Sequence, residues 1–252
     1  MSFQMNRKQW VLSIAYGQGM IAVLTILNVF YPEYLSYWFV IFIGAMFVYM
    51  YFMMRTQLKH ITSKEAKEIK TGRLLYKGKA EDIRELQVKD HLLVQELKPM
   101  MKYTFLSFLI LIATFAWYPM YFNYAKTISE STVDLTTKIA VYLIGYEFPY
   151  ALVMSTNLLS RKGMKEVVQV LNGYEIYDKG LLGMGLTIKF PVENMPYKVV
   201  ADRSRKFVQF EQRRGKSVVK YRLYTKSVDR VGDILKRYGK IKEIEEVGQT
   251  RK

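Results

Sequence analysis

Glu147 is the residue with the clearest potential for chemistry, because it lies near the centre of an apolar stretch, residues 139–159. A carboxylate in the middle of a bilayer costs roughly 2.5–3.5 kcal/mol on insertion scales, and such residues usually face a bundle interior or a water-filled cavity. Glu147 is therefore a candidate for a polar groove, an ion or proton site, or a contact with a client segment. A structural Glu147, protonated or hydrogen-bonded to Gln18, Asn28 or Thr114, stays open as the alternative.

Gln18 and Asn28 are the polar candidates in the first apolar stretch of the chain. Gly17 and Gly19 flank Gln18, so neighbouring helices can approach closely and find an amide partner. We expect Gly17, Gln18 and Gly19 to serve helix packing rather than binding. The intramembrane polar candidates are thus Glu147, Gln18 and Asn28.

Motifs for catalysis, metal binding and cofactor binding fail on inspection. The chain has no cysteine, which excludes disulfides, thiol catalysis and cysteine-based metal sites. Its two histidines, His60 and His91, fall in a charged segment where we expect them to be solvated. Gly215-Lys216-Ser217 resembles the end of a phosphate-binding loop, but Phe210 occupies the position of its first glycine. The sequence predicts a non-enzymatic protein with no catalytic residue, metal or cofactor.

Basic residues are concentrated after the last apolar stretch, where 22 Lys and Arg face 11 Asp and Glu. Attraction to anionic headgroups, about 1 kcal/mol per basic residue near the surface, accounts for such a cluster. Ribosomal RNA would be bound through the same phosphate electrostatics, but headgroup docking is the favoured interpretation. The candidate contacts with lipid or another anionic partner are Arg161, Lys162, Arg203, Arg205, Arg213 and Arg214.

The elements that must position these residues begin with four membrane spans. Crossing the hydrocarbon core takes roughly 20 mainly apolar helical residues. Four stretches meet this requirement: 10–30, 35–54, 103–121 and 139–159.

Flanking charge predicts the orientation of these spans. Arg7 and Lys8 precede the first span, no Lys or Arg lies between the first two, and twelve lie in residues 55–102. Only Lys126 and Lys138 separate the last two spans. The chain is therefore expected to be a multi-pass protein of the cell membrane with both termini in the cytoplasm.

The middle segment, residues 55–102, is predicted to form a cytoplasmic helical hairpin. Residues 62–65 make a capping box, which opens a helix towards Tyr76 that Gly78 breaks. A second helix from about Lys79 carries an apolar stripe that Asp90 interrupts and leads into the third span. A solvated charged linker is the alternative.

The tail, residues 165–240, changes to the two-residue period of strands. Strands are predicted at 174–177, 186–190, 198–201, 207–210 and 218–224. A helix follows, with Ser227 as its N-cap and Gly239 as its C-terminal glycine cap. This order suggests a small α+β domain like a pleckstrin-homology domain, with a frayed end at 241–252. The predicted fold is an α-helical polytopic membrane protein that carries this domain. Its parts are a helical hairpin at 1–54, the cytoplasmic hairpin at 55–102, a second membrane hairpin at 103–160 and the tail domain.

Two resemblances bear on function. The order of segments, with YEIYDKG at 174–180 and IKFP at 188–191, resembles an uncharacterised family of archaeal membrane proteins. Residues 55–163, with LKPMMK at 97–102 and SRK at 160–162, are similar to the YidC/Oxa insertase superfamily. That similarity implies a hydrophilic groove with Glu147 as its polar residue, where bacterial members use an arginine. The extra first span and the inside N-terminus depart from that pattern.

These features leave three hypotheses for function. The favoured one is a membrane scaffold or adaptor, which has lipid headgroups, a protein partner or a second copy of the chain as its partners. The second is an insertase-like biogenesis factor that acts with a ribosome. The third is a small oligomeric transporter or channel.

Overall fold

The computed structural model describes residues 7–34, 37, 40, 41, 44, 47, 48, 51, 63–183, 185–192, 197–214 and 217–247. The chain divides into two compact units, described separately below. The helical unit comprises Met1–Tyr49 and Met100–Gly163, and the sheet unit comprises Met50–Pro99 and Met164–Lys252. The predicted second span, residues 35–54, lies almost wholly outside the described residues.

The helical unit is built from long apolar helices. Helix α1 is Arg7–Phe30, the 3-10 helix η1 is Pro32–Tyr34, α5 is His91–Ser131 and α6 is Leu135–Gly163. Within the described part of the chain, three helices are long and apolar enough to cross a membrane: α1, α5 and α6. These helices confirm the apolar helical character predicted for 10–30, 103–121 and 139–159. Helix α5 extends beyond its predicted span, 103–121, at both ends. Its 41 residues correspond to about 60 Å of helix.

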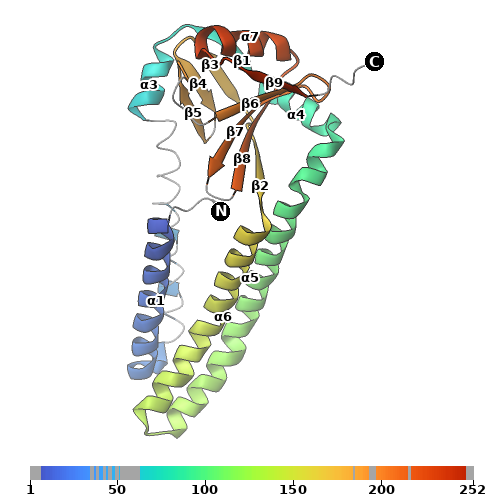
Figure 1. The fold of residues 1–252 in the computed structure, drawn as a ribbon. Helices are drawn as coiled ribbons and strands as arrows, with labels where there is room; N and C mark the ends of the chain where they lie inside the picture. Colours follow the sequence, from blue (N-terminus) through green and yellow to red (C-terminus); the bar gives the residue numbers. More distant parts are fainter. Residues whose placement is uncertain are drawn as a thin grey trace. The chain divides into compact units, whose positions relative to one another are not determined.

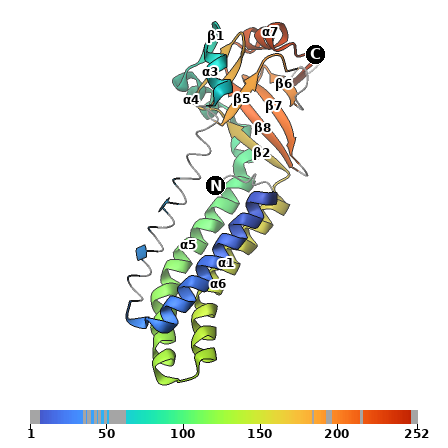
Figure 2. The same cartoon turned by 90° about the vertical axis from the view of Figure 1, so that its left-hand side faces the viewer.

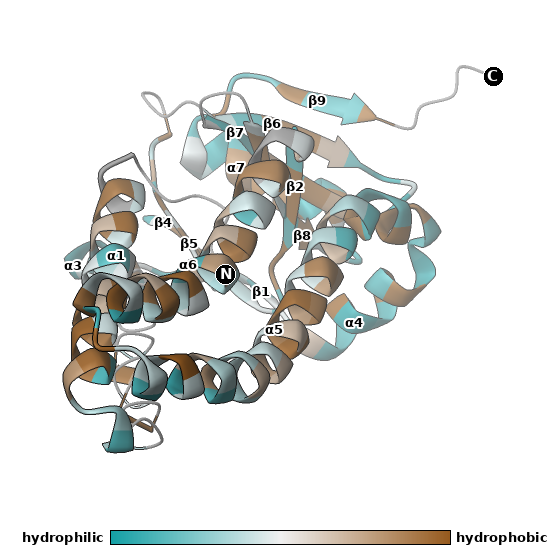
Figure 3. Ribbon diagram, turned by 90° about the horizontal axis from the view of Figure 1, so that it is seen from below, coloured by the Kyte–Doolittle hydropathy of each residue, from teal (hydrophilic) through white to brown (hydrophobic). Residues whose placement is uncertain are grey.

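Helices α1 and α6 pack against each other in this unit, and α5 joins α6 through a tight turn (Figure 2). The carboxylate of Asp134 caps α6 by accepting hydrogen bonds from the amides of Thr136 and Thr137 at 3.2 and 2.9 Å. A small apolar core includes Leu24 of α1 and Phe122 of α5. Apolar residues also occupy the outer surfaces of α1, α5 and α6 (Figure 3), which suits helices surrounded by lipid.

The sheet unit contains two sheets and three shorter helices (Figure 1). One sheet has the order β1-β3-β4-β5, and all its pairs are antiparallel. The other has the order β2-β8-β7-β6-β9, in which β2 with β8 and β6 with β9 are parallel. The strands are β1 Leu74–Gly78, β2 Glu166–Val170, β3 Tyr174–Tyr177, β4 Gly180–Gly183, β5 Leu186–Lys189, β6 Tyr197–Asp202, β7 Phe207–Arg214, β8 Ser217–Tyr224 and β9 Ile244–Val247. The helices are α3 Lys64–Lys70, α4 Ala80–Lys89 and α7 Val228–Gly239.

The middle segment differs from the predicted helical hairpin. Helix α3 does begin at a serine cap, where the hydroxyl of Ser63 accepts from the amide of Ala66 at 3.1 Å. It ends at Lys70, and the residues predicted to continue it form strand β1. Strand β1 pairs with β3, so its conformation is fixed by a partner about 100 residues away along the chain. Helices α4 and α5 contribute Ile83, Leu86 and Leu93 to the core of the tail, so the segment and the tail form one unit.

The five strands predicted in the tail are confirmed as β3, β5, β6, β7 and β8, with some shifts at their ends. Strands β2, β4 and β9 were missed, and the parallel pairs make the sheet more complex than the predicted pleckstrin-homology-like arrangement. Helix α7 is also confirmed, but its cap differs from the prediction. Lys240, at φ 51°, occupies the left-handed C-cap position, whereas Gly239 is the last helical residue.

Gly78 has to lack a side chain, because a Cβ atom there would lie 2.3 Å from the ring of Tyr174. We expect Gly78→Ala to destabilise the sheet unit by about 1–3 kcal/mol, the usual cost of overpacking a core. Gly173→Ala is the matched control, since a Cβ atom at Gly173 meets nothing within 4 Å. Thermal unfolding followed by circular dichroism of the full chain in detergent measures the difference, and equal midpoints for both variants would contradict it.

Candidate functional site

Glu147 and Gln18 lie together in the helical unit. The amide of Gln18, on α1, donates to the carboxylate of Glu147, on α6, at 3.4 Å. Gln18 is exposed and Glu147 is half-buried within the described structure. The contact is one of the pairings that the structural interpretation of Glu147 anticipates.

Asn28 does not join this pair. Its side chain is fully buried, and its amide nitrogen donates to the hydroxyl of Tyr146 on α6. The hydroxyl of Thr114, another suggested partner of Glu147, donates instead to the carbonyl of Ile110 in its own helix at 2.8 Å. The predicted polar candidates therefore form two separate contacts between α1 and α6 rather than one polar groove. Hydrogen bonds of this kind hold transmembrane helices in register.

The sheet unit contains a second cluster, a buried ion network of two carboxylates and two guanidinium groups. Arg205 contacts Asp90 at 2.9 Å and Glu96 at 2.7 Å. Arg222 contacts Glu96 at 2.7 Å and lies 3.7 Å from Asp90. Only 2% of the side chain is exposed for both Asp90 and Arg222, and 17% for Arg205. The formal charges balance, so the network places no net charge in the core.

Neutral side chains complete the coordination of Arg222. Gln209 on β7 accepts two hydrogen bonds from its guanidinium group, at 3.0 and 2.9 Å. The guanidinium carbon also lies 4.1 Å from the centre of the Phe207 ring, within cation–π range. Tyr224 on β8 donates its hydroxyl to Asp90. Each of these partners comes from β7 or β8, which are adjacent strands.

Asp90 lies at the junction of two helices. It follows the last residue of α4 and precedes the first residue of α5. Its carboxylate also accepts from the amide of Leu93 at 3.3 Å, in the manner of an N-cap. The same side chain thus ends one helix, begins the next and contacts the arginines of the sheet.

The electrostatics keep the network ionised. Burial alone would raise the pKa of Asp90, but hydrogen bonds from Arg205 and Tyr224, together with both guanidinium charges, hold it below its usual value. Burial likewise opposes the charge of Arg205, but its hydrogen bonds to Glu96 and Asp90 raise its pKa. Burial raises the pKa of the Tyr224 hydroxyl, and the bond to Asp90 adds to this effect. The contacts are therefore between permanent charges at neutral pH.

The basic residues predicted to contact lipid lie in different environments in the structure. Arg205 belongs to the network, and Arg203 pairs with Asp229 and Glu246, each at 2.7 Å. Arg213 is exposed on β7. The side chains of Arg161, Lys162 and Arg214 lie outside the described part of the structure. Arg222 and Glu96 are not among the predicted site residues, although the sequence shows Asp90 as a break in an apolar stripe.

Comparison with known proteins places the chain among membrane proteins. A family described as "Predicted membrane protein (DUF2208)" matches residues 12–238. The match covers both polar contacts of the helical unit and the whole ion network. No curated protein and no solved structure matches the chain.

Asn28→Leu should weaken the pairing of α1 with α6, because it removes the hydrogen bond to Tyr146 from a low-dielectric interface. We expect a loss of about 0.6 kcal/mol, the average for such bonds in a membrane protein, and no more than about 1.7 kcal/mol, the largest value. A double-mutant cycle with Tyr146→Phe, measured by unfolding in mixed micelles, isolates the coupling between the two side chains. Additive effects of the two substitutions would contradict the interpretation.

Arg222→Met should destabilise the sheet unit by about 3–5 kcal/mol, because it removes one partner of a buried ion network and leaves two carboxylates with Arg205 as their single counter-charge. Arg203→Met is the matched control, since Arg203 is 48% exposed and its ion pairs lie in water. We expect that control to cost no more than about 1 kcal/mol. Denaturant unfolding of both variants measures the contrast, and similar losses would show that the network is not a determinant of stability.

Proposed function

The chain belongs to the family described as Predicted membrane protein (DUF2208), and we propose that it acts as a non-enzymatic membrane scaffold or adaptor. In this proposal the chain is a four-span protein of the cell membrane with both termini in the cytoplasm. Its sheet unit is a cytoplasmic docking domain for anionic headgroups or a protein partner.

The proposal is based on the partners of the buried charges in the sheet unit. A catalytic acid or base has to exchange a proton with a substrate within hydrogen-bond reach. In the sheet unit, the carboxylates that converge with arginines, Asp90 and Glu96, are instead engaged by Arg205 and Arg222. Their contacts hold the start of α5 on the sheet, and α5 itself continues into the helical unit. The network thus attaches a folded domain to a membrane helix, which is what an adaptor requires.

One end of the second sheet offers a basic surface for docking. Lys165 lies two residues after Gly163, the last residue of α6. Its carbonyl accepts from the amide of Val218 on β8, and Val218 pairs with Arg213 on β7. Lys165 and Arg213 are both exposed. Two exposed basic residues, Lys165 and Arg213, thus lie on either side of Val218, beside Glu166, which pairs with Lys220. Lys165 is also covalently close to a helix that can cross the membrane, which supports contact with anionic headgroups.

Hydrogen exchange of the full chain in nanodiscs tests this docking. We expect the amides of β7 and β8 near Arg213 to exchange more slowly in discs with phosphatidylglycerol than in discs of phosphatidylcholine alone. Arg213→Glu should abolish the difference, because it replaces attraction by repulsion. Lys64→Glu, which reverses an exposed charge on α3, should retain it.

Equal exchange in both lipids would remove headgroup docking from the proposal. The adaptor role would then depend on a protein that copurifies in mild detergent with the wild type but not with Arg213→Glu. Absence of both effects would contradict the proposal as a whole.

The two alternative functions predict different results in native membranes. An insertase would crosslink to nascent membrane segments, and Glu147→Ala would weaken those crosslinks. A transporter or channel would give a flux that depends on Glu147 in reconstituted vesicles. Among the described residues, Asn28 bonds to Tyr146 and not to the Gln18–Glu147 pair, so these contacts do not themselves favour either alternative.

A further inference from the structure

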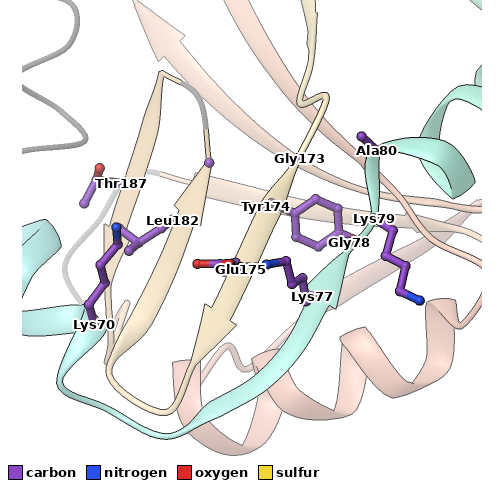
Figure 4. Close-up of a pocket in the computed structure, with 11 residues that line it drawn as sticks. Lys70, Lys77, Gly78, Lys79, Ala80, Gly173, Tyr174, Glu175, Leu182 and Thr187 are labelled. Atoms are coloured by element: carbon purple, nitrogen blue, oxygen red, sulfur yellow. Dashed lines mark ion pairs between the residues drawn. The ribbon is translucent and has the colours of Figure 1, made fainter.

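The carboxylate in the groove on the first sheet already has its partners (Figure 4). Glu175 lies 2.9 Å from the ammonium of Lys77 and accepts a hydrogen bond from the hydroxyl of Tyr177 at 2.9 Å. That carboxylate is therefore engaged within the sheet unit. A polar group that depends on another helix for its partner lies in the helical unit, on α6.

Helix α6 has a proline in its interior, Pro149. Proline has no amide hydrogen, so Pro149 cannot donate to the carbonyl four residues earlier, which belongs to Gly145. Glycine also restrains a helix least, because its backbone has the greatest conformational freedom. Residues 145–149 are therefore a turn of α6 that its own backbone holds weakly, and prolines are the usual sites of helix bending.

Helix α5 supplies the missing donor. The indole nitrogen of Trp117 donates to the carbonyl of Gly145 at 3.0 Å. Two neighbours fix the indole ring, since the ring centres of Tyr121 and Phe148 each lie 4.6 Å from it. Gly145 allows this close approach, because a Cβ atom there would lie 2.7 Å from the ring of Tyr121. The carbonyl that Pro149 leaves free is thus satisfied by a side chain of another helix, as membrane helices with prolines require.

The two parts of α6 on either side of this turn differ in their packing. Among the described residues, those that α6 contributes to the apolar core of the helical unit are Val141, Tyr142, Tyr146 and Tyr150. Beyond Tyr150, the exposed apolar side chains of α6 are Leu152, Val153, Leu158 and Leu159. Helix α6 contacts α5 again at its last residue, where the missing side chain of Gly163 leaves room for the hydroxyl of Tyr103. The apolar core therefore anchors the part of α6 before the turn and not the part after it.

We propose that residues 145–149 are a hinge in α6 and that the hydrogen bond from Trp117 sets its angle. While this bond is present, the two parts of α6 keep one direction relative to each other. When it is broken, the part after Pro149 changes direction. Helix α6 ends at Gly163 and the sheet unit begins again at the next residue, Met164. The hinge therefore provides a covalent route by which a change between α5 and α6 acts on the sheet unit.

Distances between spin labels on the two parts of α6 test this hinge. The chain has no cysteine, so Leu143→Cys and Leu159→Cys, at two exposed positions, give unique labels about 24 Å apart along the helix. For the full chain in nanodiscs, we expect a single narrow distribution of distances by double electron–electron resonance. Trp117→Phe should broaden this distribution towards shorter distances, because it removes the indole donor but keeps an aromatic ring.

Two further variants separate the hinge from a general loss of packing. Tyr121→Phe is the matched control, because the Tyr121 hydroxyl also donates from α5 to α6, to the carbonyl of Val141 at 3.0 Å. That carbonyl is the helical acceptor of the amide of Gly145, so it keeps a donor and the distribution should stay narrow. Pro149→Ala restores the missing amide of α6. In that background, Trp117→Phe should no longer broaden the distribution.

The proposal is overturned if Trp117→Phe leaves the distribution narrow, or if it broadens the distribution equally in the Pro149→Ala background. Broadening of the same size by Tyr121→Phe would also overturn it, since the effect would then belong to aromatic packing between the helices. Both labels lie within α6, so these results are independent of headgroup docking, which is measured at Arg213.

Discussion

The sheet unit depends on the contact between the carboxylate of Asp90 and the arginines of the second sheet. Asp90 separates α4 from α5, so its position decides where two helices end and begin. Four charges, of which those of Asp90, Arg205 and Arg222 would be costly to bury alone, are brought together in ion pairs. A helix shifted by one residue would leave carboxylates and guanidinium groups unpaired. The network therefore specifies how the middle segment joins the tail more than it adds to net stability.

The features that the sequence predicts well are those set by local composition or period. Apolar length alone identifies α1, α5 and α6, because a helix in lipid has to present apolar residues on all sides. Alternation identifies β8, where Val219, Tyr221 and Leu223 are buried. The apolar face of α7 is equally clear, since Val231 and Leu235 are fully buried.

The features that the sequence does not predict are those set by distant partners. Strand β1 has no period of its own and becomes a strand because β3 lies beside it. Arg205 and Arg222 occur in a basic run that indicates a solvated surface, but both reach into the core because Asp90 and Glu96 lie opposite. Nothing in the run distinguishes these arginines from Arg213, which is exposed. The sequence does indicate the network at one point, where Asp90 interrupts an apolar stripe. The reason for this interruption is clear only from the structure, in which Arg205 and Arg222 contact Asp90.

Two tyrosines link the first sheet to the network. Tyr174, a buried residue of β3, donates its hydroxyl to the carbonyl of Tyr224 at 3.1 Å. Tyr224 in turn donates its own hydroxyl to Asp90. These two hydrogen bonds, joined through Tyr224, connect β3 to the residue that precedes α5. Packed cores respond to small shifts by changing between discrete arrangements rather than by deforming smoothly. Because Tyr224 bonds both to Tyr174 and to Asp90, a displacement of β3 would act first on the start of α5.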